Sequence, residues 1–358
     1  MTPIPLLEPL TPRRRPGGVP VVALAHNEAN IVRAFLDHYR ALCEPDFLIV
    51  DDHSTDGTTE LLLDAPDVSV FRPVAGSTYE RDKAEWRGAL LDRFGTGRWC
   101  LAPELDEHFV APGAAGRPLS AYVADLEDEG AEAALAVMID MYADLPLRDH
   151  RFDAAAGRSL AASFPLFDGP GEAPLGYMLH WPAKRFHAAY PTPPLRVVGG
   201  LRERLFNHRL RRLGPLRRRL VQSVSGLDGP LSPEGWHARR LALARRLTKR
   251  AFKGTLNVAK LPLVKWRAGL RYGGGPHAVN ARLPLSESVG ALLHYKFTRG
   301  ADGLAYVAER GQHADGSRYY RSMLAREAVF AASPVGPTTR VYEGPASLAG
   351  IVREAPGR

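Results

Sequence analysis

The sequence predicts an α/β fold in which helices alternate with the strands of a doubly wound, mainly parallel sheet. Four short apolar runs have the length of buried strands, and they cover residues 20–25, 47–50, 68–71 and 99–101. Helical segments separate these runs, and strands joined through helices pair in parallel by right-handed crossovers. From Asp144 the chain is rich in Pro and Gly and then in Arg, which predicts an irregular and helical second half.

Each predicted helix has its own sequence signal. Apolar residues with the spacing of one helical face are Ile31, Val32, Phe35, Leu36, Tyr39 and Leu42. Asp56 and Gly57 fit a turn that caps a helix over 58–64, and Gly95 is the expected residue after a helix over 79–94. Further apolar strands are expected at 134–141 and 289–293.

The composition indicates a folded protein with a large core. The chain has 358 residues, of which 45% are hydrophobic. Cys43 and Cys100 are expected to be small core residues, because two cysteines give neither a disulfide framework nor metal-ligand spacing. No apolar run approaches the roughly 18 residues of a membrane span, and the N-terminus lacks the apolar region of a signal peptide. These features favour a cytoplasmic protein.

The net charge of +8 is concentrated in one region. Between Leu201 and Tyr272, nineteen Lys and Arg residues face only Glu203, Asp228 and Glu234. The leucine spacing within 201–250 fits amphipathic helices, and such a segment suits peripheral contact with an anionic membrane at its cytoplasmic face. The alternative is an ordinary solvated, Arg-rich surface. Nucleic acid is not expected as a partner, because the acidic clusters described next would repel phosphate.

Polar side chains gather where three predicted strands end. His26-Asn27-Glu28 follows the first strand, Asp51-Asp52 the second, and the acidic stretch 104–107 the fourth. The carboxyl ends of parallel strands meet at one edge, where open α/β sheets bind ligands. Random surface charge has no reason to choose the same edge three times. This convergence is the main physical argument for a functional site.

The stretch from Trp99 to Val110 carries the densest acidic cluster. Side chains alternate along an extended chain, so Glu104 and Asp106 are expected to point the same way. Two carboxylates in that position repel unless a cation lies between them, and hard oxygen ligands suit Mg²⁺ or Mn²⁺. The alternative is a set of solvated loop acids or helix caps. No Gly-rich phosphate loop occurs, so a bound diphosphate would need a metal and basic side chains to neutralise it.

Several blocks carry a family resemblance. Val21 to Glu28, followed by Val50 to Thr58, resembles the opening of family-2-like glycosyltransferases of the GT-A fold. Trp99 to Val110 resembles the Asp-x-Asp-Glu-Phe segment of the same group. Blocks at 199–206, 274–280 and 292–297 are similar to later blocks of a bacterial subgroup, so the resemblance covers roughly residues 19 to 300.

This resemblance implies a division of the chain. It implies a GT-A type, Rossmann-like sheet whose nucleotide-sugar-binding half covers 19–145 and whose acceptor-side half, with Arg-rich helices, covers 146–330. The flanking residues are expected to form a loosely ordered arm (1–18) and a turn-rich tail (331–358).

The resemblance also implies roles for single residues. Asn27, Glu28 and Asp52 would line the nucleobase and ribose pocket, with Asp51 as their neighbour. Asp106 and Glu104 would bind the metal, although Glu104 stands where the family has an Asp. His294 would complete the metal shell, and its alternative is a packed histidine.

For the catalytic base the first choice is Glu203 and the second is Asp140. Glu203 lies just after Gly199-Gly200, and Asp140 lies in the apolar run 134–141. An ordinary helix salt-bridge partner is the alternative for Glu203.

The activity implied is that of a metal-dependent, inverting, hexosyltransferase-like enzyme. It would move a sugar from a nucleotide-diphosphate sugar to a hydroxyl of a glycan, polysaccharide or lipid-linked acceptor, with Mn²⁺ or Mg²⁺ bridging the donor diphosphate. A carboxylate would remove the acceptor proton. The alternatives are a catalytically impaired GT-A protein that acts as a binding module, and a nucleotidyltransferase. The latter should have a Gly-rich phosphate loop after the first strand, and residues 25–29 contain no glycine.

Overall fold

The computed structural model describes residues 4–113, 115–171, 176–180, 184–207, 213–252, 254–273, 275–312 and 314–355. Parts of four predicted features lie outside these ranges: the ends of the arm and tail (1–3 and 356–358), residues 208–212 of the Arg-rich segment, and Gly274 of the block 274–280.

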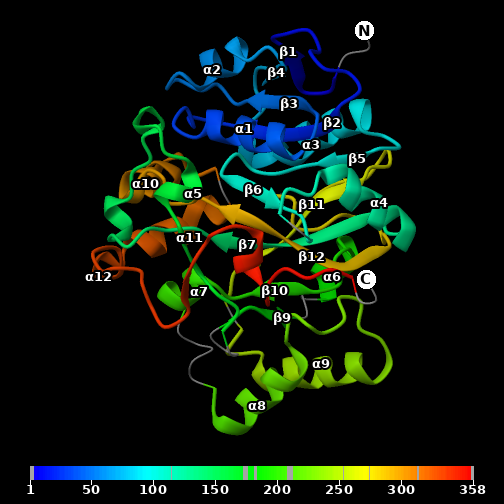
Figure 1. The fold of residues 1–358 in the computed structure, drawn as a ribbon, viewed down its shortest axis with the longest axis vertical. Coiled ribbons are helices and arrows are strands. Elements are labelled where there is room, and N and C mark those ends of the chain that lie inside the picture. Colours follow the sequence, from blue (N-terminus) through cyan, green and yellow to red (C-terminus); the bar gives the residue numbers. More distant parts are fainter. Residues whose placement is uncertain are drawn as a thin grey trace.

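One large sheet forms the centre of the molecule (Figure 1). In the described residues its strands follow the order β1 (Leu7–Pro9), β4 (Val68–Pro73), β3 (Pro45–Asp51), β2 (Val19–Ala25), β5 (Trp99–Leu101), β11 (Ala259–Lys265), β7 (Ala133–Asp140), β12 (Leu285–His294) and β6 (Glu107–Val110). Strands β4, β3, β2 and β5 are parallel, and so are β7 and β12. Because β11 is antiparallel to both β5 and β7, these two groups run the same way. The predicted α/β fold with a mainly parallel sheet is therefore confirmed.

The first three helices cover both faces of the sheet. They are α1 (Val32–Leu42), α2 (Thr58–Asp64) and α3 (Tyr79–Phe94), and the predicted bounds of α2 and α3 are confirmed. The chain moves outward from β2 to β3 and β4, then returns across β2 to β5. Right-handed connections therefore place α1 and α2 on one face and α3 on the other. Consistently, α1 contacts α2, whereas α3 packs on β2.

Local sequence signals fix the ends of these elements. Gly57 precedes α2 with φ = 93°, in the left-handed region that favours glycine. Asp56 accepts a hydrogen bond from the backbone N–H of Thr58 at 3.1 Å, so the chain turns directly from the end of β3 into α2. Cys43 and Cys100 are both free; Cys100 is buried in the core as predicted, whereas Cys43 is half-buried.

The second half adds helices and two small sheets around the main sheet. Its helices, with one from the first half, are α4 (Leu119–Glu129), α5 (Leu160–Ser163), α6 (Lys184–Ala189), α7 (Leu201–Phe206), α8 (Pro215–Val224), α9 (Gly235–Thr248), α10 (Gly300–Arg310), α11 (Ala314–Leu324) and α12 (Glu327–Phe330). Strand β9 (Met178–His180) pairs with β10 (Arg196–Val198), and β8 (Leu166–Asp168) pairs with β13 (Thr339–Val341). Short 3₁₀ helices cover Leu147–Asp149, Ala154–Ala156 and Pro345–Leu348. Within the described ranges, no helix combines the length and the apolar character that crossing a bilayer requires.

The arm and the tail differ from the prediction, because both are bound to the sheet. Strand β1 pairs with β4, and Arg13 forms an ion pair with buried Asp46. In the tail, Val289 and Arg353 exchange two backbone hydrogen bonds of 2.9 and 3.0 Å. An edge strand leaves backbone N–H and C=O groups that need partners, and β1 supplies them to β4. Short segments of this kind have no periodicity from which the sequence could predict them.

Candidate active site at the carboxyl edge of the sheet

The ends of several parallel strands bring the predicted site residues to one edge of the sheet. Glu28 follows β2, Asp106 follows β5, Asp140 ends β7 and His294 ends β12. The register of β7 against β12 places Asp140 directly beside His294. The backbone N–H of Tyr295 donates to the carbonyl oxygen of Asp106 at 2.8 Å, which ties the segment after β5 to the end of β12.

A chain of alternating charges runs through this edge. His294 Nδ1 lies 2.6 Å from Asp140 Oδ1, and His294 Nε2 lies 3.3 Å from Asp106 Oδ2. On the far side, Arg202 of α7 donates from Nε to Asp140 Oδ2 at 2.8 Å. Arg202, Asp140 and His294 are all buried. Each buried charge therefore has a partner of opposite sign, which burial requires.

Burial and these partners act in opposite directions on the pKa values. Burial alone would raise the pKa of Asp140, but Arg202 and His294 outweigh it and hold the pKa at about 2. Burial would lower the pKa of His294, but the carboxylates of Asp106 and Asp140 outweigh it and raise the pKa above its ordinary value. Asp140 is thus held as a carboxylate whose two oxygens are both engaged.

Two lysines lie within the acidic cluster. The ammonium group of Lys260, a buried residue of β11, is 2.8 Å from Glu107 Oε1 and 3.3 Å from Glu104 Oε1. Lys296 Nζ lies 3.6 Å from Asp106 Oδ2. Burial would raise the pKa of Glu104, but Lys260 outweighs it and lowers the pKa to about 2. Lysine ammonium groups therefore stand beside the carboxylates that were predicted to hold a cation.

The predicted metal set of Glu104, Asp106 and His294 is not assembled. Asp106 and His294 are adjacent, whereas Glu104 lies against Lys260. Across the part of the chain that the structure describes, no three His, Cys, Asp or Glu side chains are grouped so that they could hold one metal ion. As they lie, these side chains do not fit a three-ligand metal site.

Glu28, Asp106, Lys296 and Arg299 line a narrow pocket at this edge. Burial raises the pKa of Glu28, and the nearby Asp106 carboxylate raises it further. Glu28 Oε2 is buried and has no hydrogen-bond partner among the described residues. The raised pKa favours the neutral form of Glu28, whereas Asp106 is held ionised, so the pocket combines one charged carboxylate with two cationic side chains and suits an anionic polar ligand.

Helix α10 covers the rest of the predicted nucleotide pocket. Arg310 forms an ion pair with Asp52, and the side-chain amide of Asn27 donates to the hydroxyl of Tyr306 at 2.7 Å. Asp51 instead accepts from Thr59 Oγ1 at 2.8 Å and from Arg72 at 3.1 Å. Asn27 and Asp52 therefore contact α10, whereas Asp51 connects β3 to its neighbours α2 and β4.

Glu203 lies on α7 beside Arg202 and is buried. Its neighbours Arg202 and Arg204 bond to Asp140 and Asp168 respectively, and Glu203 does not line the pocket of Glu28 and Asp106. Its role as the base stays a prediction.

Sequence reasoning missed Lys260, Lys296 and Arg202. Lys260 had a usable signal, because it is a single charged residue inside the apolar run 258–264. A lysine there is buried and therefore needs an acidic partner. Lys296 likewise follows the strand that ends at His294. Arg202 had no such signal, since it is one of many arginines in its segment.

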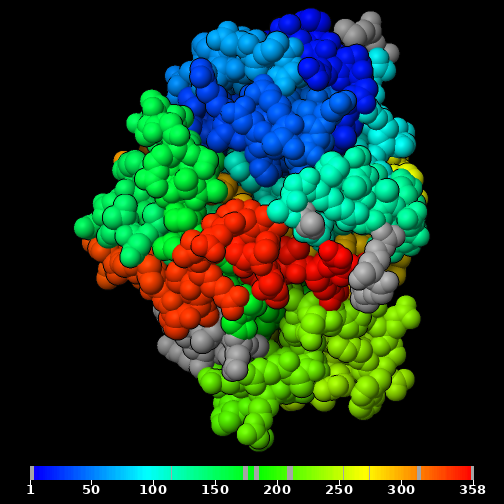
Figure 2. Space-filling model, in the orientation of Figure 1, coloured from blue at the N-terminus to red at the C-terminus, as the bar shows by residue number. Residues whose placement is uncertain are grey.

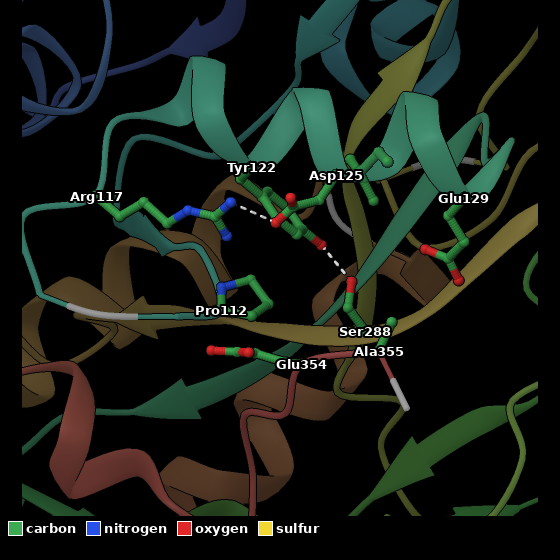
Figure 3. Close-up of a pocket in the computed structure, with 9 residues that line it drawn as sticks. Pro112, Arg117, Tyr122, Asp125, Glu129, Ser288, Glu354 and Ala355 are labelled. Atoms are coloured by element: carbon green, nitrogen blue, oxygen red, sulfur yellow. Dashed lines mark hydrogen bonds and ion pairs between the residues drawn. The ribbon is translucent and has the colours of Figure 1, made fainter. Parts of the chain in front are cut away.

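A second pocket, between α4 and β12, satisfies its own polar groups (Figure 3). Arg117 forms an ion pair with Asp125 at 2.5 Å, and the hydroxyls of Tyr122 and Ser288 are 2.7 Å apart. These polar groups bond to one another and do not need a ligand to satisfy them. Asp125 is therefore a suitable control position for variants of the site.

A third pocket is lined by two stacked histidines. The rings of His38 and His108 lie 4.3 Å apart between centroids, and His38 Nε2 donates to the Phe109 carbonyl at 2.9 Å. Burial lowers the pKa of His38 to about 4, from 6.5 in an exposed histidine. The unfolded chain therefore takes up a proton below pH 6.5 that the folded chain takes up only near pH 4.

This difference predicts that His38 reduces stability in acid. As the pH falls through the window between these two pKa values, the unfolding free energy should drop by on the order of 3 kcal/mol because of this group. Over the same pH range, the unfolding free energy of the His38→Gln variant should fall by correspondingly less. Urea unfolding of both proteins across this pH range tests the prediction, and equal losses in wild type and variant would contradict it.

The chain matches no protein-family model, and a search of curated proteins finds no match. Among solved structures it is similar to one described as a proposed glucose-1-phosphate thymidylyltransferase from Bacillus anthracis in complex with sucrose. The identity is 14% and the TM-score 0.24, and the match covers 36% of this chain and 57% of that chain. The chain thus matches little more than half the length of that protein. The fold therefore rests on the strand order and connections of this chain itself.

Proposed function

We propose that this chain is a glycosyltransferase that transfers a sugar from a nucleotide-diphosphate sugar to an acceptor hydroxyl of a glycan, polysaccharide or lipid-linked molecule. The observation that carries the proposal is the convergence of Glu28, Asp106, Lys296 and Arg299 on one pocket from the ends of three strands, β2, β5 and β12. That edge is where open α/β sheets bind ligands. The resemblance of residues 19 to 300 to GT-A glycosyltransferases supplies the reaction class.

In this proposal Lys296 and Arg299 bind the donor diphosphate. Both are cationic and line the pocket, and Lys296 is held beside Asp106. As the bond to the sugar breaks, negative charge develops on the leaving diphosphate, and fixed cations in a water-poor site stabilise it. In this proposal the charge of the diphosphate is therefore neutralised by Lys296 and Arg299.

Asp140 is proposed as a positioning residue. Its carboxylate binds the Nδ1–H of His294 and the guanidinium of Arg202, so it fixes the ring that faces Asp106. A carboxylate with a pKa near 2 is a weak base, and so Asp140 suits this role better than proton removal. Removal of the acceptor proton then belongs to another carboxylate, for which Glu203 remains the predicted residue.

Turnover of nucleotide sugars tests the proposal. Release of nucleoside diphosphate should be measured with a panel of UDP-, GDP- and dTDP-sugars, with and without Mn²⁺. We expect one donor class to be consumed, and the Asp106→Asn variant to be slower by about 100-fold or more, as when one electrostatic group of an active site is removed. Asp125→Asn, in the pocket of Figure 3, is the matched control and should keep its rate. Failure to consume any donor, or an equal loss in the control, would overturn the proposal.

A further inference from the structure

Helices α8 and α9 form a projecting unit with an unusual surface. We call residues 213–252 the α8–α9 hairpin. The two helices pack on each other, and Arg240 donates to Ser223 Oγ across their contact at 3.2 Å. In Figures 1 and 2 the hairpin projects from the end of the molecule opposite β1. Its surface is therefore accessible to a large partner.

The hairpin exposes four large apolar side chains. Leu216 is 81% exposed, Trp236 73%, Leu243 50% and Leu247 44%. Ten large apolar side chains are exposed in the described residues, and these four all lie in one 40-residue segment. Water-exposed apolar groups that are concentrated in this way mark interaction surfaces.

The exposed apolar and the buried residues of α9 form two separate stripes. Leu241, Ala244 and Thr248 are buried, which is the spacing of a single helical face. Trp236, Leu243 and Leu247, at intervals of seven and four residues, form a second stripe about 110° around the helix from the buried one. The inner face is thus occupied by the protein core, and the outer apolar stripe is left for a partner.

Positive charge is interleaved with this apolar stripe. The basic residues of the hairpin are Arg217, Arg218, Arg219, Arg239, Arg240, Arg245, Arg246, Lys249 and Arg250. Only Asp228 and Glu234 oppose them, and none of the nine forms an ion pair within the described ranges. A surface with unpaired basic groups between Trp and Leu side chains matches an interface that is anionic outside and apolar just beneath.

We propose that the outer face of the α8–α9 hairpin binds the surface of an anionic membrane. The apolar side chains would enter the boundary between headgroups and acyl chains, and the arginines would contact the lipid phosphates. Nucleic acid would satisfy the arginines equally well but would leave Leu216, Leu243 and Leu247 in water, so the apolar stripe favours the membrane. This surface is separate from the strand-end pocket, and the inference does not depend on the reaction proposed there.

Vesicle sedimentation of the full chain tests this inference. The probes are vesicles of phosphatidylcholine alone and of phosphatidylcholine with about 30% phosphatidylglycerol, at low salt. We expect binding to the anionic vesicles only, and weaker binding at high salt because exposed charges are screened. Trp236→Ser/Leu243→Ser and Arg239→Glu/Arg246→Glu should each weaken the binding by about tenfold or more.

Matched controls distinguish binding by the hairpin from non-specific apolar or electrostatic binding elsewhere on the protein. Leu145→Ser removes an exposed leucine elsewhere, and Arg15→Glu/Arg93→Glu makes the same change in net charge on exposed positions outside the hairpin. Both should bind as wild type does, and circular dichroism should show that all variants are folded. The inference is overturned if the protein does not bind anionic vesicles, or if the controls lose as much binding as the hairpin variants. It is also overturned if Arg239→Glu/Arg246→Glu weakens binding but Trp236→Ser/Leu243→Ser does not. The last result would indicate a polyanion site, and binding of single-stranded RNA with the same dependence would confirm that reading.

Discussion

The Lys260→Met variant is expected to lose about 3–5 kcal/mol of unfolding free energy, the loss that follows when one partner of a buried ion pair is removed. Lys260 lies in the middle of the sheet, and its ammonium group is 2.8 Å from Glu107 and 3.3 Å from Glu104. Methionine keeps the length of the side chain but leaves the buried Glu107 carboxylate without its cation. Urea unfolding of variant and wild type measures the loss.

A second variant distinguishes this electrostatic loss from poor packing. Lys260→Met/Glu107→Gln removes the uncompensated charge, so it should be more stable than Lys260→Met alone. The exposed Lys265, which pairs with Glu127 at the end of the same strand, is the surface control. Lys265→Met should cost no more than about 1 kcal/mol, as for other exposed ion pairs. If Lys260→Met costs as little as this, Lys260 does not balance the buried carboxylates.

The Lys296→Met variant is expected to bind nucleoside diphosphate about 10- to 100-fold more weakly than wild type, which corresponds to one charge-assisted hydrogen bond. Lys296 lines the pocket with Glu28, Asp106 and Arg299, and it is the cation nearest to Asp106 after His294. Its removal leaves the Asp106 carboxylate and Arg299 as the charged groups that line the pocket, so an anionic ligand should bind more weakly. Isothermal titration calorimetry measures the change.

The same surface control applies to binding. Lys265→Met removes the same charge at a distance from the pocket and should bind nucleotide as tightly as wild type. An equal loss of affinity in both lysine variants would show that net charge, and not the pocket, determines binding.

Sequence reasoning predicted the parallel part of the fold well because its signals are local. The apolar runs and helical periodicity between residues 19 and 110 give β2 to β5 and α1 to α3, and the bounds of α2 and α3 agree with the structure. It also placed Asn27, Glu28, Asp52 and Asp106 at strand ends, and the structure brings them to one edge. Asp140 was predicted within the run 134–141, and the structure shows that it ends β7 beside His294, which ends β12. Local patterns therefore suffice to place side chains at an edge.

What the sequence did not predict depends on contacts between distant residues. Strand β11 inserts between β5 and β7, and this insertion brings Lys260 to Glu104 and Glu107, more than 150 residues earlier in the chain. The pairing of Asp140 with His294 likewise requires β7 and β12 to be neighbours. The lysines beside the carboxylates follow from these distant pairings.

Calorimetric titration of UDP, GDP, dTDP and CMP against the wild-type chain, in Mn²⁺ and in EDTA, tests the central claim most directly. We predict that at least one of the nucleoside diphosphates binds at the strand-end pocket, and that its affinity falls in the Lys296→Met variant. Comparison of the two buffers also tests the metal requirement that the resemblance implies. If none of the four binds in either buffer, the claim that this edge of the sheet is a nucleotide-sugar site is contradicted.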